Sequence, residues 1–188
     1  MKRFLTAALV LLMFSAQVEA VPFTRTQLDK IYFDAEQVQA DSTLNLNAEA
    51  FKEKFNGIIT PVLKEAMQTD DVSAMEHLFL IKNYKIIGET FTNMFGDYRV
   101  AVVGKCAEGG NFKALSFCYT TPEERDESIF TIWLLTAFIK SISPDVNPQT
   151  LMEELTAENS SGFVVKGDIK FSIAEDGNVN TLTATATE

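Results

Sequence analysis

Histidine, cysteine and tryptophan are scarce in this chain of 188 residues, which contains one histidine, two cysteines and one tryptophan. A Ser-His-Asp or Cys-His catalytic site would have to use His77, and no nucleophile motif accompanies it. Zinc sites normally use several His or Cys ligands, so the sequence predicts no metal centre. No glycine-rich phosphate-binding loop leads into a helix either. We therefore expect a protein that is not an enzyme and needs no cofactor.

Long apolar runs are also missing beyond the start of the chain, so we expect no stable membrane insertion. At the start, Lys2 and Arg3 precede an apolar run from Phe4 to Phe14 that is too short to span a bilayer. Val18 and Ala20 then occupy the −3 and −1 positions that signal peptidase prefers. We predict that the first 20 residues are a secretory signal peptide, and that the mature protein is periplasmic or secreted, in a bacterial envelope.

Basic residues are outnumbered in this sequence, with 16 lysines and arginines against 26 aspartates and glutamates. An acidic protein is repelled by the phosphate backbone of nucleic acids. We therefore expect no nucleic-acid partner.

The two cysteines are Cys106 and Cys118. Because exported proteins meet an oxidising compartment, we predict a disulfide bond between them. The bond has a geometric condition. A two-residue turn at Gly109-Gly110 would set Cys118 opposite Ala101 and hold the sulfurs apart, so the bond requires a wider loop or a bulge.

The pattern of the mature chain predicts a single α+β domain over residues 21–188. Its expected parts are a helical N-terminal part (21–70), a three-stranded meander (84–120), two helices (121–158) and a hairpin (162–187). The predicted fold is a largely antiparallel sheet of about five strands, in the order β-β-β-α-α-β-β. An apolar helix packs on one face, and helices precede the sheet.

Start signals mark several of the expected helices. Asn47 can cap a helix that contains Pro61, which lacks an N–H and is expected to kink or break it. Thr121-Pro122 is a helix start followed by a segment that is apolar on every side around Trp133 and is therefore predicted to be buried. Asn147-Pro148 marks the start of the next helix.

The C-terminal hairpin has the clearest pattern. Apolar residues occupy alternate positions from Phe163 to Ile173, and threonines recur at every second position of the following strand. With Asp176-Gly177 as the turn, Phe171 faces Leu182 on the apolar side. The threonines then point to the opposite side.

Glu89 is the single weak candidate for a ligand contact. If Gly96-Asp97 centres the first hairpin, Phe91 faces Val102 and Glu89 lies on the same side, among apolar neighbours. A carboxyl in such a place has a raised pKa and can contact a ligand. The alternative is that Glu89 lies at an exposed strand end.

Two classes of function remain for this sequence. The first is a non-enzymatic exported protein that binds another macromolecule, such as an inhibitor or an immunity-type protein. The alternative is a carrier of a small apolar ligand in a pocket between helix and sheet, which would suit the fifteen phenylalanines. Core packing explains the phenylalanines equally well. A large pocket would favour the carrier, and a filled core with an exposed apolar patch would favour the interaction protein.

Overall fold

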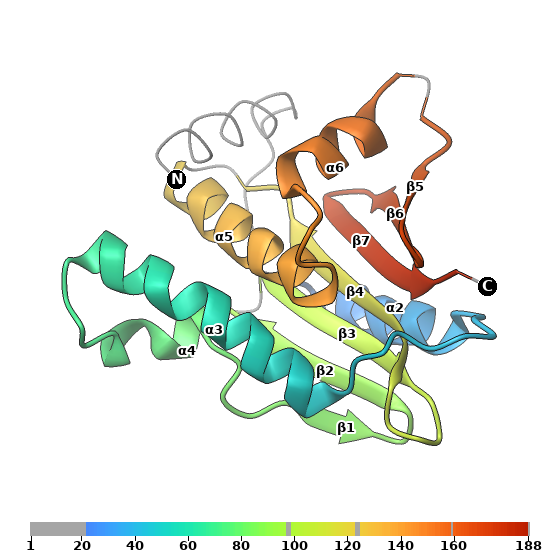
Figure 1. Ribbon diagram of the computed structural model, residues 1–188, viewed down its shortest axis with the longest axis horizontal. Coiled ribbons are helices and arrows are strands. Elements are labelled where there is room, and N and C mark those ends of the chain that lie inside the picture. The colour runs from blue at the N-terminus through green and yellow to red at the C-terminus, as the bar shows by residue number, and fades with distance from the viewer. Residues whose placement is uncertain (1–21, 97–98, 123–124, 159, 188) are drawn as a thin grey trace.

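In the computed structural model the chain forms an α+β fold around a seven-stranded antiparallel sheet (Figure 1). The structure describes residues 22–96, 99–122, 125–158 and 160–187, so the predicted leader and its cleavage point after Ala20 lie outside the described residues. The strand order is β1-β2-β3-β4-β7-β6-β5. The strands are β1 (Lys85–Ile87), β2 (Thr90–Phe95), β3 (Val100–Cys106), β4 (Phe112–Thr120), β5 (Phe163–Lys166), β6 (Ile169–Asp176) and β7 (Val179–Ala186). The helices are α2 (Arg25–Gln37), α3 (Ala48–Met67), α4 (Glu76–Phe79), α5 (Arg125–Ile142) and α6 (Pro148–Thr156), with a 3-10 turn at Ser73–Met75.

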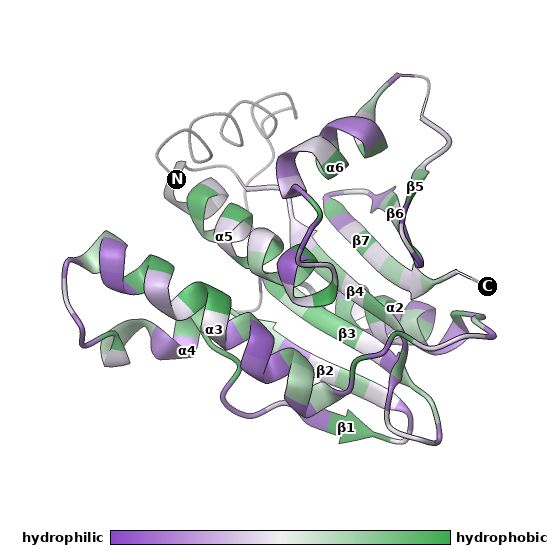
Figure 2. Ribbon diagram, in the orientation of Figure 1, coloured by the Kyte–Doolittle hydropathy of each residue, from purple (hydrophilic) through white to green (hydrophobic). Residues whose placement is uncertain are grey.

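Helices cover both faces of the sheet, but unequally. Helices α3, α5 and α6 lie over one face, here called the inner face, and α2 lies on the other, here called the α2 face (Figure 1). The strands on which helix α2 packs extensively are β2, β3 and β4. Figure 2 shows that α5 is largely hydrophobic, as its all-round apolar sequence predicted.

Phenylalanine rings fill the core beneath the inner face. Phe51 of α3 lies at the centre, with its ring centroid 5.6 Å from that of Phe55 and 6.2 Å from that of Phe138. Phe117 of β4 lies 5.5 Å from Phe138 and connects the sheet to α5. Eight phenylalanine side chains are fully buried: Phe51, Phe55, Phe91, Phe95, Phe112, Phe117, Phe138 and Phe171. The explanation of the phenylalanines by core packing is therefore confirmed.

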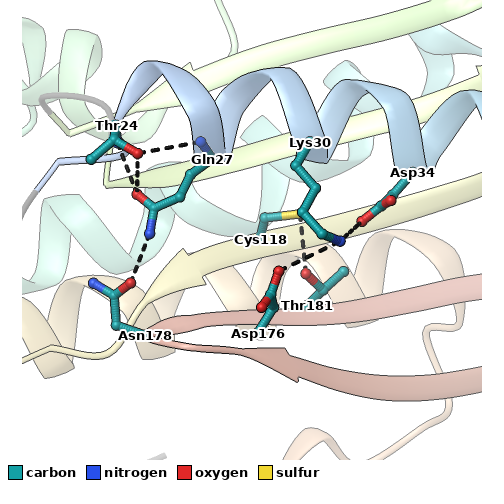
Figure 3. A network of polar contacts seen from close by, with 8 residues as sticks. All are labelled: Thr24, Gln27, Lys30, Asp34, Cys118, Asp176, Asn178 and Thr181. Atoms are coloured by element: carbon teal, nitrogen blue, oxygen red, sulfur yellow. Dashed lines mark hydrogen bonds and ion pairs between the residues drawn. The ribbon is translucent and has the colours of Figure 1, made fainter.

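On the α2 face, a small apolar cluster is extended by polar contacts (Figure 3). Thr24 and Gln27 form a capping box at the start of α2, and the Gln27 Nε2 atom donates a hydrogen bond to Asn178 Oδ1 at 2.8 Å. The Lys30 ammonium lies 3.5 Å from the Asp176 carboxylate. These contacts connect α2 to the turn between β6 and β7.

The predicted helix starts at Asn47 and Asn147 are confirmed, since each asparagine side chain accepts a hydrogen bond from a backbone N–H in the first turn of its helix. Of the kink or break expected at Pro61, the break is wrong, because α3 runs through this residue from Ala48 to Met67. Ile59 and Leu63, on either side of the proline, are both 1% exposed. Their burial against the core stabilises the helix despite the missing hydrogen bond.

The sheet has seven strands rather than about five because two segments interpreted as single strands are hairpins. Gly88-Glu89 separates β1 from β2, and Gly167-Asp168 separates β5 from β6. The two glycines have φ values of 61° and 63°, in the left-handed region that a two-residue hairpin turn beginning with glycine requires. Because the Gly167-Asp168 turn interrupts the alternation of side chains, Phe163 and Val165 lie on the opposite side of the sheet from Phe171 and not on the inner face.

The register of the C-terminal hairpin differs from the predicted one by two positions. Phe171 pairs with Ala184, and Leu182 pairs with Ile173, because the turn is Gly177-Asn178 and not Asp176-Gly177. A shift of two preserves the side on which every residue lies. Phe171 and Leu182 are accordingly buried on the inner face, and Thr183 lies on the α2 face opposite Ser116.

The predicted disulfide bond is wrong, since Cys106 and Cys118 are both free and buried. A bulge next to Cys106 pairs it with Phe112, while Cys118 pairs with Ala101. The paired positions are five residues apart along β3, which is about 16 Å. Cys106 also packs in the core of the inner face, whereas Cys118 packs in the cluster beneath α2. The two cysteines therefore lie on opposite faces of the sheet.

Candidate functional site

An apolar cleft lies beside α5. Its volume is about 1480 Å³, and it extends from α3 across the outer side of α5 to α6 and the adjoining ends of β4, β6 and β7. Small-molecule pockets typically measure about 300–1,000 Å³, so this cleft can hold a long ligand. It is partly open to solvent, which allows a ligand to enter without unfolding of the core.

Aliphatic side chains form most of the cleft wall. They are Ile58 and Val62 of α3, Ile132 and Leu135 of α5, Met152 of α6 and Ile173 of β6. No phenylalanine of the described chain lines the cleft, because the phenylalanines that point inward fill the core below it. The large number of phenylalanines, which suggested a pocket in the sequence, therefore does not account for this cleft.

The arrangement of three helices explains why the cleft stays open. Helix α3 packs against one flank of α5, and α6 contacts the other flank. The inward residues of α5, such as Leu134 and Phe138, are completely buried against the sheet. Its outward residues Ile132 and Thr136 are only half-buried, because nothing in the described chain covers them.

At one end of the cleft, the floor is polar and is formed by three neighbouring strands. Tyr119 of β4 pairs with Asn180 of β7, which in turn pairs with Glu175 of β6. The Asn180 Nδ2 atom donates a hydrogen bond to Thr121 Oγ1 at 3.1 Å. A row of hydrogen-bonding groups therefore lies beneath apolar walls at this end.

Two largely buried side chains that line the cleft, Tyr119 and Thr131, carry hydroxyl groups without a hydrogen-bond partner in the described part of the chain. Tyr119 is 5% exposed and Thr131 of α5 is 4% exposed, and neither side chain makes a hydrogen bond within the described part of the chain. Burial, together with a smaller contribution from the Glu175 carboxylate, raises the pKa of Tyr119 to about 12. The phenol is therefore protonated at neutral pH and can both donate and accept a hydrogen bond.

Trp133 forms part of the opposite wall, on the α3 side of α5. Its ring lies 5.9 Å from that of Phe79, which also contacts Phe130 at 4.9 Å. The Trp133 Nε1 atom is buried and has no hydrogen-bond partner in the part of the protein that is described. As the single tryptophan of the chain, Trp133 is a natural fluorescent reporter of this cleft.

The charged residues of the cleft are of both signs. Lys54 and Lys140 both line the cleft, and the Lys140 ammonium donates a hydrogen bond to the Pro144 carbonyl at 2.6 Å. Three acidic residues also line the cleft: Glu65, Asp145 and Glu175. The acidic groups therefore outnumber the lysines around the apolar wall.

The residues singled out in the sequence lie away from this cleft. Glu89 is exposed in the turn between β1 and β2, because the strand on which its predicted inward position depended begins only at Thr90. His77 lies exposed on α4, as expected for a surface histidine. Cys106 and Cys118 are buried in the two separate cores.

Within the described ranges, no group of three or more His, Cys, Asp or Glu side chains is placed to bind a metal ion. None of the helices in those ranges is long and apolar enough to cross a membrane. Comparison with protein-family models, with curated proteins and with solved structures gave no match. The arguments about function below therefore use only the geometry and chemistry of this molecule.

Tyr119, Thr131 and Asn180 were missed in the sequence because hydroxyl and amide residues in a strand or helix carry no local signal of their surroundings. The phase of β4 could have placed Tyr119, which shares the inner side with Leu115 and Phe117. What the sequence could not show is that Tyr119 lines a cleft to which α3, α5 and α6 also contribute.

Proposed function

We propose that this chain is an exported, non-catalytic binding protein that carries a long apolar ligand in the cleft beside α5. The observation that carries the proposal is the combination of a volume of about 1480 Å³ with a predominantly aliphatic wall. Burial of hydrocarbon in such a wall stabilises a complex by roughly 25 cal/mol for each Å² removed from water. The basic and apolar character of residues 1–20 supports export.

Titration with 1-dodecanol, followed by Trp133 fluorescence and by calorimetry, tests this proposal. We expect a saturable change of emission at one ligand per chain, because Trp133 lines the cleft. Ile132→Lys, which puts an ammonium into the apolar wall, should weaken binding at least about tenfold.

The matched control is Ile87→Lys, at a position that is 72% exposed on β1 and does not line the cleft. It introduces the same charge change and should leave binding unaltered. A failure to saturate, or equal binding by Ile132→Lys and the control, would contradict the proposal. Thermal melts of both variants separate a loss of binding from a loss of folding.

A second candidate function, the binding of a macromolecular partner, is favoured by the open edge of the sheet at β5. Phe163 and Val165 are 42% and 47% exposed there, and β5 pairs only with β6. An extended segment of a partner could add to such an edge through backbone hydrogen bonds. On this hypothesis, Val165→Lys removes the interaction of the protein with its partner in envelope extracts, whereas Ile132→Lys preserves it. The cleft proposal predicts the reverse order of sensitivity for 1-dodecanol.

A further inference from the structure

We propose that the ligand of the cleft is a single-chain amphiphile with an uncharged, hydroxyl-bearing end, and that this end binds at Tyr119 and Thr131. This inference rests on the proposed function and adds the chemical class and the orientation of the ligand. It predicts that the hydrocarbon chain extends from the polar floor along the aliphatic wall of α5.

The first argument is the state of the two hydroxyl groups. Tyr119 and Thr131 are each at least nine-tenths buried, and both line the cleft without a hydrogen bond to another described residue. Buried polar groups in proteins are nearly always hydrogen-bonded, and a group that lacks a protein partner at a cleft is available to a ligand. Two hydroxyls, each able to donate and accept, suit a ligand group that also does both.

The second argument is the composition of the floor around Tyr119. Asn180 supplies an amide beside it, and the neighbouring position on β6 is the acidic Glu175. A carboxylate or phosphate end would lose its hydration at this floor and would find no positive charge on Tyr119, Asn180 or Glu175. The chain as a whole is also acidic, with a formal net charge of −10.

The third argument is the position of the lysines. Lys140 follows Thr131 by nine residues on α5, which places it about 13 Å further along the helix. Lys54 lies within one turn of Phe51, whose ring contacts that of Phe138 near the same end of α5. Lys140 therefore lies well away from Thr131 along α5, and its ammonium already donates a hydrogen bond to the Pro144 carbonyl.

An ammonium end is disfavoured for a different reason. A positive charge that is moved from water to a floor as deeply buried as Tyr119 loses hydration, and two neutral hydroxyls and an amide replace that hydration incompletely. Glu175 is exposed to solvent, so its attraction for a cation is screened. An alcohol end loses much less hydration and gains the same hydrogen bonds.

The test compares 1-dodecanol, dodecanoate and dodecylammonium at pH 8, each below its micelle concentration, by Trp133 fluorescence and calorimetry. The proteins are the wild type, Tyr119→Phe, Thr131→Val and the control Tyr32→Phe, which removes a hydroxyl on the α2 face. The two cleft variants keep the shape of the side chain and delete only its hydroxyl group or replace it with a methyl. Urea unfolding of each variant shows that the fold is intact.

We expect 1-dodecanol to bind the wild type at least about tenfold more tightly than either charged analogue. Tyr119→Phe and Thr131→Val should each weaken 1-dodecanol binding roughly three- to tenfold, as expected for one lost hydrogen bond, while Tyr32→Phe should leave it unchanged. Equal or tighter binding of a charged analogue, or equal binding by the cleft variants and the control, would overturn the inference and leave the proposed function standing. If none of the three compounds binds, both the inference and the proposed function fail.

Discussion

The two faces of the sheet are built by different means. The inner face is sealed by large aromatic side chains and three helices, and its cluster contains thirty buried residues, whereas the cluster of the α2 face contains seven. On the α2 face, one helix is positioned by a few small apolar residues together with polar contacts to the Gly177-Asn178 turn. The larger buried core and the cleft that we propose to bind a ligand therefore lie on the same side of the molecule. The predictions below test this difference, from the largest effect to the smallest.

Phe51→Ala should have the largest effect, because it removes a ring that contacts Phe55, Phe91, Phe112 and Phe138. We expect the free energy of unfolding to fall by about 3–5 kcal/mol. Urea unfolding measures it. The control is Phe33→Ala, at a position that is 59% exposed on α2, which should cost less than about 0.5 kcal/mol. Similar losses for the two variants would mean that the inner core does not dominate stability.

Ile31→Ala tests the α2 face in the same assay. Ile31 is 7% exposed and packs in the seven-residue cluster, so we expect a loss of about 2–3 kcal/mol, smaller than that of Phe51→Ala. Because the cleft lies on the other face, binding of 1-dodecanol to the folded variant should not change. A loss equal to that of Phe51→Ala would remove the contrast between the two faces.

Alkaline pH provides a separate probe of each face. Burial raises the pKa of the Cys118 thiol on the α2 face from 9.0 to about 12, and that of Tyr119 on the inner face from 10.0 to about 12. In the unfolded chain both groups ionise earlier, so unfolding releases protons and the free energy of unfolding falls as the pH rises towards 12. The slope is at most about 1.4 kcal/mol per pH unit for each group.

Urea unfolding between pH 8 and pH 11 can separate these two contributions. Cys118→Ala should make the decline shallower from about pH 9, and Tyr119→Phe should do so from about pH 10. Near pH 8, the free energy of unfolding of both variants should change with pH as it does in the wild type. An unchanged slope in either variant would show that its group is not buried as the structure has it.

Thr183→Ala should have the smallest effect. The Thr183 hydroxyl lies 2.9 Å from that of Ser116 on the α2 face, and the contact is partly buried. We expect a loss of about 0.5–1 kcal/mol, the value of one partly exposed hydrogen bond. In a double-mutant cycle with Ser116→Ala, the second substitution should add little. Additive losses would mean that the two hydroxyls do not interact.

The sequence predicted most of what depends on local rules. Asparagine caps, the apolar pattern of α5 and the side on which each residue of β6 and β7 lies were predicted correctly, because each depends on neighbours within a few residues. The predicted register of the first hairpin was wrong, since Phe91 pairs with Gly104 and not with Val102. The number of strands and the register of the C-terminal hairpin were wrong for one shared reason. Three hairpins turn at Gly88-Glu89, Gly167-Asp168 and Gly177-Asn178, each with glycine first and at positive φ, and each was either missed or shifted by one residue.

The cleft, in contrast, could be predicted from the sequence only in part. Alternation placed an apolar helix on one face of the sheet, and a pocket between helix and sheet was one expectation. Its polar floor, however, depends on Tyr119, Asn180 and Glu175 coming together from three strands whose order along the sheet is not their order along the chain. The disulfide was wrong for a similar reason, because a bulge next to Cys106 decided which residues face each other.

The pairing of β4 with β7 also constrains how the molecule is made. Phe117 and Leu182, which are neighbours across this pair, are separated by more than sixty residues of sequence. During synthesis the edge of β4 therefore remains unpaired while α5, α6 and the following hairpin are added. Strand β7 then pairs with this edge as the last strand of the described chain. A chaperone or an export machine that keeps the chain extended until β7 has emerged would protect this edge from intermolecular pairing.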